Sequence, residues 1–471
     1  MRPEKARSQP KGARDGGREG ELTVRSWYRG VPPELARVAS SAPNYRCGVT
    51  ASPAAVAASL LAALPADAGA AVVRRGAHLL VGAAPSRVVA ADGVDALPAL
   101  DGLEPGFWVG ACSFELGHVL ERVAPRSASF APADVPDVLF ARFDALAVIA
   151  PNCSVTVRGE GPGRPLLEAA TSAPGPVPHL GASGAWRSSL SRDEFEARVE
   201  TVLGLLHAGE CYQVNVTRRL EADGALDPVA LHAALAVLHP APHGGMLRVP
   251  AGTVAQLPDA FAVVSASPEG FLRRAGDRVE TRPIKGTAPG GTDGAAALAA
   301  SAKDHAENVM IVDLARNDLG RVCIPGSMSV PEVCAIEAHP GLHHLVSTVR
   351  GTLRADVGTG ALLAATFPPA SVTGAPKPRV LGIIEELEPV RRGVYCGAFG
   401  WIDTREQQAD LAVAIRTFTV HGDGDDGCTR LGVGGGIVAD SVPAAEWDET
   451  RLKAARLLAA AGAGTPALVG A

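Results

Sequence analysis

Aromatic residues are scarce in this chain, because only 4% of its 471 residues are Phe, Trp or Tyr. Since 47% of the residues are nonetheless hydrophobic, the core must be built largely from Ala, Val and Leu, as in an ordinary soluble globular protein. This composition excludes a fibrous or a disordered chain. The length is compatible with two or three domains or with one intertwined unit.

The chain also lacks the patterns that mark several other protein classes. Its net charge is only −6 with both signs interspersed, which argues against nucleic-acid binding. The eight cysteines are scattered without a Cys-x-x-Cys pair, which argues against a zinc site or a disulfide framework and favours a reduced, cytoplasmic setting. The Ala-rich stretch 51–73 is interrupted by Pro65 and Asp67, so no membrane span is expected.

Composition divides the chain into five regions. Residues 1–21 are polar without an apolar run, which excludes a secretory signal and predicts a disordered leader. An Ala-rich region follows at 22–170. A linker rich in Pro, Gly and Ser at 171–187 leads to a motif-rich region at 188–460, and residues 461–471 are a tail of small residues.

Helices and short strands alternate in the motif-rich region. The hydrophobic spacing after Ser191, a potential N-cap, predicts a helix that leads into a strand with the sequence CYQVNVTRRL. Further strands are expected at 261–265, 278–282, 397–402, 411–418 and 429–433, and long helices at 303–317, 377–387 and 444–461. Several strands follow one another too closely for crossover helices. The pattern therefore predicts an α+β fold of antiparallel sheet with helices outside it.

Two of the predicted helices carry carboxylates that share one face. Asp304 and Glu307 are three residues apart, and Glu446, Glu449 and Lys453 follow the i, i+3, i+7 pattern. Two such faces could converge on Mg²⁺, which prefers one or two carboxylates plus waters and an oxyanion. Solvated helix faces with intrahelical ion pairs have the same spacing, so spacing alone leaves both interpretations open.

A glycine run and one lysine are further candidates. The run LGVGGGIVAD contains Gly434, Gly435 and Gly436 without the G-x-G-x-x-G pattern of a dinucleotide loop. It is either a tight turn or a backbone concavity for a carboxylate. Lys285, in TRPIKGT, follows a β-like segment and precedes a Gly-Thr pair. A desolvated lysine can act as a nucleophile or base near neutral pH, although most lysines are simply exposed.

Taken together, these motifs resemble the chorismate-utilising enzyme family, which contains anthranilate synthase component I, aminodeoxychorismate synthase component I, isochorismate synthase and salicylate synthase. The matching segments, in order from about residue 188 to 455, are GECYQVNVTRRL, SASPEGF, TRPIKGT, SAKDHAENVMIVDLARNDLGRV, HHLVSTVRGTL, SVTGAPKPRV, YCGAFGWID, AIRTF and GVGGGIVADSVPAAEWDET. The first 170 residues resemble the family only loosely, chiefly in WVGACSFELGHVLERV. The resemblance implies two large antiparallel sheets in a sandwich, with helices outside and the active site between.

The resemblance also implies roles for individual residues. Glu307 and Glu449 match the family's Mg²⁺ ligands, Asp304 and Glu446 match its outer-shell carboxylates, and the ion would also bind the ring carboxylate of chorismate. The residues that would contact the substrate are Gln213, His344, Ser371, Thr373, Tyr395, Arg416, Gly434, Gly435, Gly436 and Lys453. Among them, Tyr395, Arg416 and the glycine run would hold the enolpyruvyl carboxylate, and His344 and Ser371 would lie against the ring.

Two positions distinguish the branches of the family. Isochorismate and salicylate synthases have a lysine base where this chain has Gln213, so attack of water at C2 is disfavoured. Anthranilate synthases have alanine where this chain has Lys285, whereas the C4-aminating branch has lysine. In that branch the lysine adds covalently at C2 as the C4 hydroxyl leaves, and ammonia then attacks C4 to give 4-amino-4-deoxychorismate, on the way to 4-aminobenzoate for folate or for a secondary metabolite.

Glu269, in SASPEGF, matches the general acid of the family. It must be partly protonated while Lys285 is neutral, so burial is expected to move the two pKa values toward each other.

No segment resembles a class I glutamine amidotransferase, whose nucleophile lies in a Gly-x-Cys-x-Gly turn. Ammonia would therefore come from solution or from a separate glutaminase subunit, which implies a heterodimer. Two other functions stay open on the sequence. One is formation of anthranilate or another 2-substituted product, and the other is a non-catalytic subunit that binds chorismate.

Overall fold

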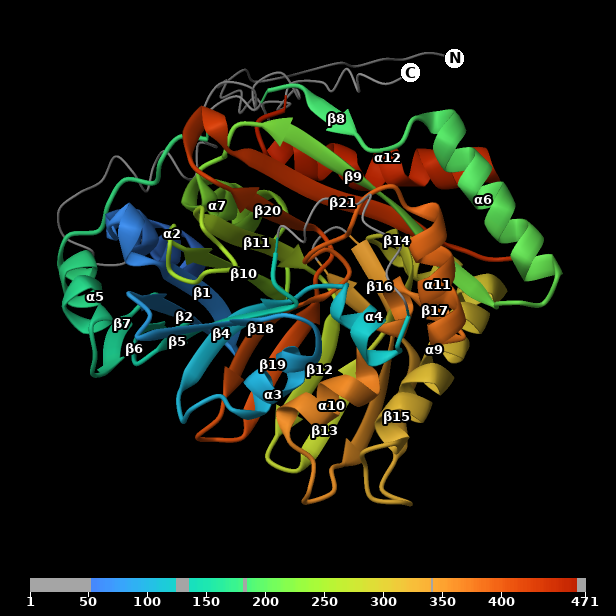
Figure 1. Ribbon diagram of the computed structural model, residues 1–471, viewed down its shortest axis with the longest axis horizontal. Helices are drawn as coiled ribbons and strands as arrows, with labels where there is room; N and C mark the ends of the chain where they lie inside the picture. Colours follow the sequence, from blue (N-terminus) through green and yellow to red (C-terminus); the bar gives the residue numbers. More distant parts are fainter. Residues whose placement is uncertain (1–51, 124–134, 181–183, 340–341, 464–471) are drawn as a thin grey trace, which may run out of the picture.

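The computed structural model describes residues 52–123, 135–180, 184–339 and 342–463 (Figure 1). The predicted leader at 1–21 and nearly all of the predicted tail lie outside these ranges. Two antiparallel sheets pack together with helices outside them, which confirms the predicted α+β architecture. No helix in the described ranges is long and apolar enough to cross a bilayer.

Sheet A contains eleven strands in the described part of the chain, and its neighbouring strands are antiparallel. In spatial order the strands are β17 (Gly374–Ala375), β9 (Gln213–Asp223), β21 (Cys428–Ile437), β20 (Thr417–His421), β11 (Phe261–Ser267), β10 (His243–Val249), β1 (Ala70–Arg75), β2 (His78–Ala83), β6 (Ala145–Ile149) and β7 (Val155–Gly159), with β8 (Trp186–Ser188) paired to β9.

Sheet B contains ten strands in the same described ranges and is also antiparallel. In spatial order the strands are β14 (Ile284–Pro289), β16 (Leu342–Thr352), β13 (Arg278–Arg282), β12 (Gly270–Ala275), β19 (Gln408–Val413), β18 (Ala398–Asp403), β4 (Phe107–Cys112), β5 (Val138–Phe143) and β3 (Arg87–Ala91), with β15 (Ser329–His339) paired to β16.

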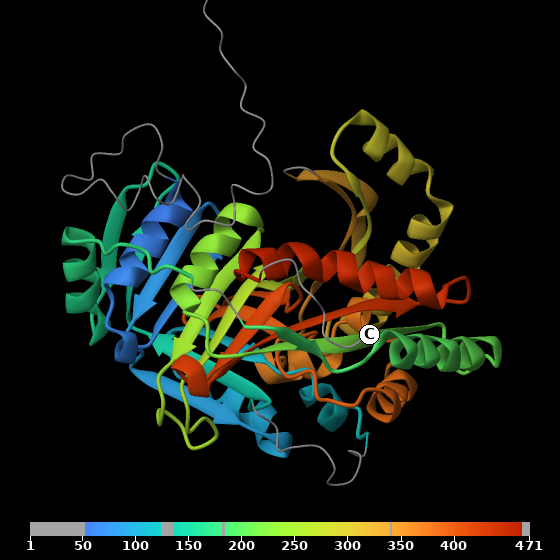
Figure 2. The same ribbon diagram turned by 90° about the horizontal axis from the view of Figure 1, so that it is seen from above.

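The helices cover the sheets from outside. Sheet A is covered by α2 (Pro53–Ala63), α5 (Gly163–Ser172), α6 (Arg192–His207), α7 (Pro228–Leu238) and α12 (Pro443–Ala460). Strands β14 and β16 of sheet B are covered by α8 (Thr292–Ala300) and α9 (Ala302–Gly320). The remaining helices are α3 (Ala96–Asp101), α4 (Leu116–Leu120), α10 (Thr359–Thr366), α11 (Lys377–Leu387) and the short η2 (Ala66–Ala68), η3 (Gly93–Asp95), η4 (Ala370–Val372) and η5 (Gly424–Asp426). Figure 2 shows α12, in red, lying alongside β21.

Local sequence signals account for where helices begin. Helix α6 begins after Ser191, whose hydroxyl accepts from the Glu194 N–H at 3.3 Å while the Glu194 carboxylate accepts from the Ser191 N–H at 2.8 Å. This reciprocal capping box satisfies two N–H groups that the helix leaves without partners. Buried Phe195 and Val199 then attach one face of the helix to the core.

The core between the sheets unites the two long sequence regions. Val73 of β1 and Leu247 of β10 pack in one buried cluster with Phe107 of β4 and Phe399 of β18. Strand β1 from the N-terminal region pairs with β10 from the motif-rich region, and β4 pairs with β18 in the same way. Both regions therefore contribute strands to both sheets of one sandwich.

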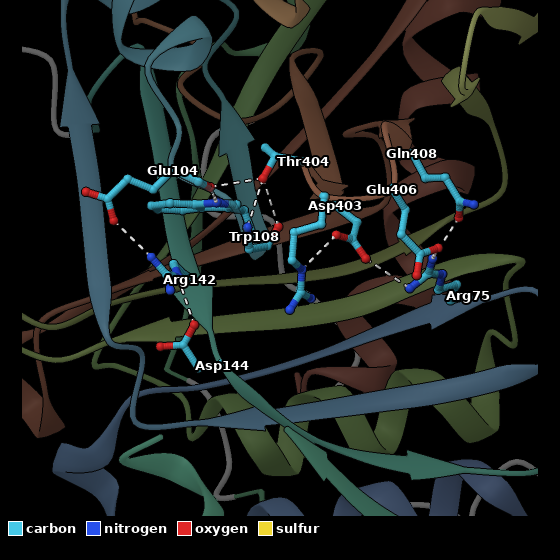
Figure 3. Close-up of polar contacts among 11 residues, drawn as sticks. Arg75, Glu104, Trp108, Arg142, Asp144, Asp403, Thr404, Glu406 and Gln408 are labelled. Atoms are coloured by element: carbon cyan, nitrogen blue, oxygen red, sulfur yellow. Dashed lines mark hydrogen bonds and ion pairs between the residues drawn. The ribbon is translucent and has the colours of Figure 1, made fainter. Parts of the chain in front are cut away.

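A charged network links the two sheets at the end of β1 (Figure 3). Arg75 of β1 donates to Asp403 of β18 at 3.3 Å, and to Glu406 and Gln408 in the β18–β19 hairpin at 2.7 Å each. Its guanidinium also lies 5.0 Å from the ring centroid of Trp401. The side chain of Asp403 is only 2% exposed, so its charge depends on these partners.

Most of the predicted elements are confirmed. The predicted helices at 303–317, 377–387 and 444–461 are α9, α11 and α12, and the predicted strand at 278–282 is β13. The strand predicted from CYQVNVTRRL is β9, which begins at Gln213.

The single strand predicted at 411–418 is wrong. Strand β19 ends at Val413 and β20 begins at Thr417, and the chain passes from sheet B to sheet A between them. Arg416 in this crossover has a φ of +51°, a conformation that side chains disfavour. The hydrophobic pattern is continuous across the break because both strands are buried, so it gives no sign of the change of sheet.

Candidate functional site

The candidate site lies where the end of β21 approaches β14, between α9 and α12. The glycine run is part of β21 rather than a tight turn, with Gly436 opposite Asn215 of β9. A Cβ at Gly436 would lie 3.0 Å from Nε2 of Gln213 and 3.5 Å from Nζ of Lys285. A side chain at this position would therefore occupy the space in which the amide and the amine meet.

A bulge in β14 places Lys285 beside α9. The register of β14 against β16 shifts directly after Lys285, at Gly286, which has a φ of +80°. A Cβ at Gly286 would lie 3.0 Å from Cβ and Cγ of Asp304. Glycine thus permits both the bulge and the close approach of the predicted outer-shell carboxylate to the strand.

The amine of Lys285 is held by an amide and a carboxylate. Its Nζ donates to Oε1 of Gln213 at 3.3 Å and lies 3.7 Å from Oε2 of Glu307, and only 14% of the side chain is exposed. Burial lowers the pKa of Lys285, opposed by the charges of Glu307 and Glu269 and assisted by that of Lys453. Deprotonation of Lys285 to the neutral amine therefore costs less free energy than deprotonation of an exposed lysine.

Glu269 follows β11 and is buried, with 5% of its surface exposed. Burial raises the pKa of its carboxyl to about 7, while a hydrogen bond from Ser371 and the charge of Lys285 lower it. A carboxyl that titrates near neutral pH can both donate and accept a proton. The pKa values of Glu269 and Lys285 thus move in the directions that the sequence predicted.

His344 and Ser371 come from two further elements. His344 lies on β16, with Nδ1 at 3.0 Å from Oγ1 of Thr287, and burial lowers the pKa of its imidazole to about 4. Its ring is therefore neutral at pH 7. Ser371 and Thr373 lie in and directly after η4 and are both buried, and the Thr373 hydroxyl donates to the Pro369 carbonyl at 2.9 Å.

Gln213 has a side-chain NH₂ group that donates to no described residue. It is fully buried, and its Oε1 accepts from Lys285, but its Nε2 has no hydrogen-bond partner among the described residues. A buried N–H group without a partner costs free energy. This NH₂ group lies beside Gly436, where a Cβ would come within 3.0 Å of it, and it keeps an unused hydrogen-bond donor among the described residues.

The predicted metal ligands come from α9 and α12 and are paired with lysines. Glu307 lies 3.9 Å from Lys303 as well as near Lys285, and Glu449 lies 2.7 Å from Lys453. The Lys453 amine also donates to the Gly434 carbonyl at 2.9 Å, which ties α12 to the glycine run. The described residues contain no group of three or more His, Cys, Asp or Glu arranged to hold a metal.

Glu446 lies one helical turn before Glu449. Its Oε1 accepts from the Ser441 hydroxyl at 2.7 Å, and a Cβ at Gly435 would lie 3.1 Å from its Oε2. Burial raises the pKa of Glu446, and the charge of Lys303 on α9 lowers it. The carboxylate faces of α9 and α12 therefore lie within electrostatic reach of each other, on two sides of the glycine run.

Tyr395 and Arg416 form no hydrogen bond or ion pair with Lys285 in the described part of the chain. A Cβ at Gly432 would overlap the Tyr395 ring at 2.1 Å, so the ring packs on β21 four residues before Gly436 and on the same face. Burial raises the pKa of the Tyr395 hydroxyl. Arg416 is close enough for its charge to lower the pKa of His344, and burial lowers its own pKa.

Sequence reasoning missed the buried residues that support this site. Arg392 and Glu388 form a buried pair behind Ser371, and Arg218 packs between β9 and α12. Thr287 is hydrogen-bonded to His344. The adjacent arginines 391 and 392 were a possible signal, because arginine is rarely buried without a partner, but the partner is evident only from the fold.

A family model described as chorismate binding enzyme matches residues 49–459. Aminodeoxychorismate synthase component 1 of Klebsiella aerogenes is 43% identical over 283 residues, which cover 59% of this chain and 59% of that protein. Anthranilate synthase component 1 of Thermus thermophilus is 37% identical over 372 residues, which cover 75% of this chain and 76% of that protein.

Among solved structures, anthranilate synthase component I from Streptococcus pneumoniae has the same fold. It matches with a TM-score of 0.67 at 23% identity, and the match covers 91% of this chain and 97% of that chain. The sequence match to the Klebsiella protein, by contrast, spans about three fifths of that protein's length.

Proposed function

The chain belongs to the family of chorismate-binding enzymes, and from this premise we propose that it aminates chorismate at C4, as the chorismate-converting component of an aminodeoxychorismate synthase. The observation that carries the proposal is the buried amine of Lys285. Its Nζ lies 3.3 Å from Oε1 of Gln213 and 3.7 Å from Oε2 of Glu307. The identity of 43% to a Klebsiella protein named for this activity supports it.

Lys285 is the proposed nucleophile. Its neutral amine would form a bond to C2 of chorismate while the C4 hydroxyl takes a proton from Glu269 and leaves as water. Ammonia would then add at C4 and expel the lysine amine from C2. The net reaction converts chorismate and ammonia to 4-amino-4-deoxychorismate and water, and two easier displacements replace one difficult one.

The residues around the amine suit this chemistry. Glu269, with a pKa of about 7, can donate the proton to the leaving hydroxyl and accept one from the added amine. Neutral His344 and the Ser371 hydroxyl would lie against the ring, and the unpartnered NH₂ group of Gln213 would donate to a substrate oxygen. Gln213 has no basic group, so it would not activate water for attack at C2.

Mg²⁺ is the proposed cofactor, with Glu307 and Glu449 as ligands and Asp304 and Glu446 in the outer shell. The donor set fits the ion because two carboxylates from facing helices, completed by waters and an oxyanion, meet its preference. Its charge would neutralise the ring carboxylate of chorismate and make the ring a better acceptor. The lysines that now pair with Glu307 and Glu449 would have to share these carboxylates with the ion.

A separate glutamine amidotransferase subunit is the proposed source of ammonia. No segment of the chain has the Gly-x-Cys-x-Gly setting of a class I glutaminase nucleophile. The Klebsiella relative is named as component 1 of its synthase, which agrees with a heterodimer.

Amination at C2 to give anthranilate is the second candidate function. The Thermus anthranilate synthase component 1 matches 75% of this chain, a larger share than the 59% matched by the Klebsiella protein. Lys285 is the observation that favours C4, because a side chain in this position would occupy the space from which ammonia reaches C2.

Product identity tests the proposal. The protein is incubated with chorismate, Mg²⁺ and ammonium, and we expect a product that 4-amino-4-deoxychorismate lyase converts to 4-aminobenzoate. Intact-mass spectrometry should detect a covalent chorismate adduct. Lys285→Ala should abolish the adduct and lower C4 amination by at least about 100-fold, because the nucleophile is lost.

Lys285→Arg is the matched control, because it keeps the positive charge without a nucleophilic amine, and it should also form no adduct. Fluorescent anthranilate as the sole product would establish the second candidate instead. An adduct of unchanged yield in Lys285→Ala would contradict the assigned nucleophile.

A further inference from the structure

A buried ion pair lies beside the η4 turn, which carries Ser371. Arg392 and Glu388 have side chains that are 2% and 6% exposed, and two hydrogen bonds join them, from Nη2 to Oε1 at 2.6 Å and from Nε to Oε2 at 2.8 Å. The Arg392 guanidinium also stacks on the Phe114 ring, 4.2 Å from its centroid. No step of the proposed chemistry uses either residue.

The pair connects the η4 turn to strand β9. Arg392 donates through Nη1 to the Val372 carbonyl at 3.0 Å and through Nη2 to the Asn215 carbonyl at 2.7 Å. Glu388 completes the connection, because its Oε1 accepts from both the backbone N–H and the hydroxyl of Thr217 at 2.9 Å. Val372 lies between Ser371 and Thr373, and Asn215 lies two residues after Gln213 on β9.

The donors of Arg392 suit this position in a way that a lysine would not. A planar guanidinium can meet a carboxylate with two parallel bonds and still reach two carbonyls on either side. An ammonium has three donors around one atom and cannot span these partners. Because a buried ion pair is often no more stable than apolar side chains of the same volume, its presence here points to fixed geometry rather than to stability.

We propose that the Arg392–Glu388 pair is a positioning device that holds the η4 turn against β9, so that Ser371 stays beside Glu269, with which it lines one cavity. The pair would thereby align the general acid with the amine of Lys285. This inference rests on the proposed function for its kinetic consequences, but the alignment itself is a property of the folded chain.

The hydrogen bond from Ser371 gives the inference a specific signature. It lowers the pKa of Glu269, which also responds to the charges of Lys285 on β14 and His243 on β10. If the turn moves away, the hydroxyl no longer stabilises the carboxylate and the pKa of Glu269 rises. Since the general acid must be protonated, the alkaline limb of the rate profile would move to higher pH.

Arg392→Lys tests the inference, with Arg391→Lys as the matched control. Arg391 is the adjacent arginine, partly exposed, and makes no hydrogen bond or ion pair to a described residue. In Arg392→Lys we expect kcat to fall by roughly 10- to 100-fold, with a smaller change in KM for chorismate and an alkaline limb at higher pH. Arg391→Lys should stay within about twofold of the wild type in kcat and keep the limb in place, because no contact is lost.

Two further measurements keep the test decisive. Ser371→Ala should move the alkaline limb in the same direction without touching the ion pair, so it replaces Arg392→Lys if that variant does not fold. A ¹³C NMR titration of the Glu269 carboxyl, assigned with Glu269→Gln, should show the same upward shift whether or not the protein turns chorismate over. The inference is overturned if Glu269 titrates as in the wild type in folded Arg392→Lys. If Arg392→Lys does not fold, the same result in Ser371→Ala overturns it. Failure of wild-type turnover would concern only the proposed function.

Discussion

Glu269 shows how the surroundings of a residue set its chemistry. The motif SASPEGF identifies the residue, but its usefulness as an acid at neutral pH comes from burial, which raises the pKa of the carboxyl from 4.5 to about 7. The Ser371 hydroxyl and the Lys285 charge oppose this increase. The pKa of this candidate general acid therefore depends on residues from three separate segments of the chain.

Glu269→Gln should remove one source of pH-dependent instability. The folded chain holds a proton on this carboxyl that the unfolded chain releases between pH 4.5 and about 7. The stabilising contribution of Glu269 is thus complete below pH 4.5 and is lost as pH rises through 7. Between pH 5 and pH 8, urea unfolding should show the wild type losing about 2–3 kcal/mol more than the variant.

The exposed Glu386→Gln serves as the control and should lose stability with pH as the wild type does. If wild type and Glu269→Gln lose equal free energy of unfolding between the two pH values, the raised pKa of Glu269 is contradicted.

At the scale of elements, Arg218 fixes α12 on sheet A. Its guanidinium is buried between β9 and α12, with Nε donating to the Thr450 hydroxyl at 3.0 Å and the charge lying 4.2 Å from the Trp447 ring centroid. Burial lowers its pKa to about 10, and its Nη2 has no partner within the described ranges. Trp447 and Thr450 directly follow Glu446 and Glu449, so a contact that fixes one face of α12 also fixes the other.

Arg218→Met should separate stability from function. Methionine keeps much of the apolar stem and removes a buried charge that has no ion pair with any residue the structure describes, so the melting temperature should be unchanged or a few degrees higher. Turnover should nevertheless fall by roughly tenfold, because α12 loses the contact that positions its carboxylates. Thermal melts and steady-state kinetics measure the two effects.

Arg451→Met is the matched control on the same helix, since Arg451 is half exposed and its ion pair in the described part of the chain is with the equally exposed Asp448. It should change neither property. A lower melting temperature with unchanged turnover in Arg218→Met would mean that Arg218 supports only the fold.

At the scale of the whole molecule, the two sheets behave as one folding unit. Strands from both long sequence regions pair in both sheets, and the core between them contains side chains from each. The network around Arg75 adds a polar connection across this core, with the buried Asp403 at its centre (Figure 3). Loss of that connection should weaken the sandwich without altering the site, which shares none of its residues.

Arg75→Ala should lower the free energy of unfolding by about 2–3 kcal/mol. It leaves the Asp403 carboxylate buried with Arg405 as its remaining ion-pair partner among the described residues, at 3.4 Å, and it removes the contact with the Trp401 ring. Urea unfolding measures the change, and activity at 25 °C should be retained. Arg87→Ala is the control, since Arg87 pairs with Glu104 where both side chains are about half exposed, and it should cost less than about 1 kcal/mol. Equal losses in the two variants would contradict the role assigned to the buried carboxylate.

The sequence by itself determined the antiparallel α+β class, most helices and strands, and the set of candidate site residues. Local signals suffice for these features: the capping box at Ser191 begins α6, hydrophobic spacing defines α9 and α11, and short intervals between strands exclude crossover helices. Motif order then predicted Lys285 and Glu269 as members of one candidate site.

Only the tertiary structure decided which residues meet and what their charges become. The passage from sheet B to sheet A at Arg416, the contact of Lys285 with Glu307 and the hydrogen bonds from Arg392 to Val372 and Asn215 all join segments that are separate in the chain or belong to different sheets. The physical reason is that pKa values and ion pairs depend on burial and on distances of a few ångströms in space. Residue spacing along the chain reports neither burial nor distances in space, except within one helix or one strand.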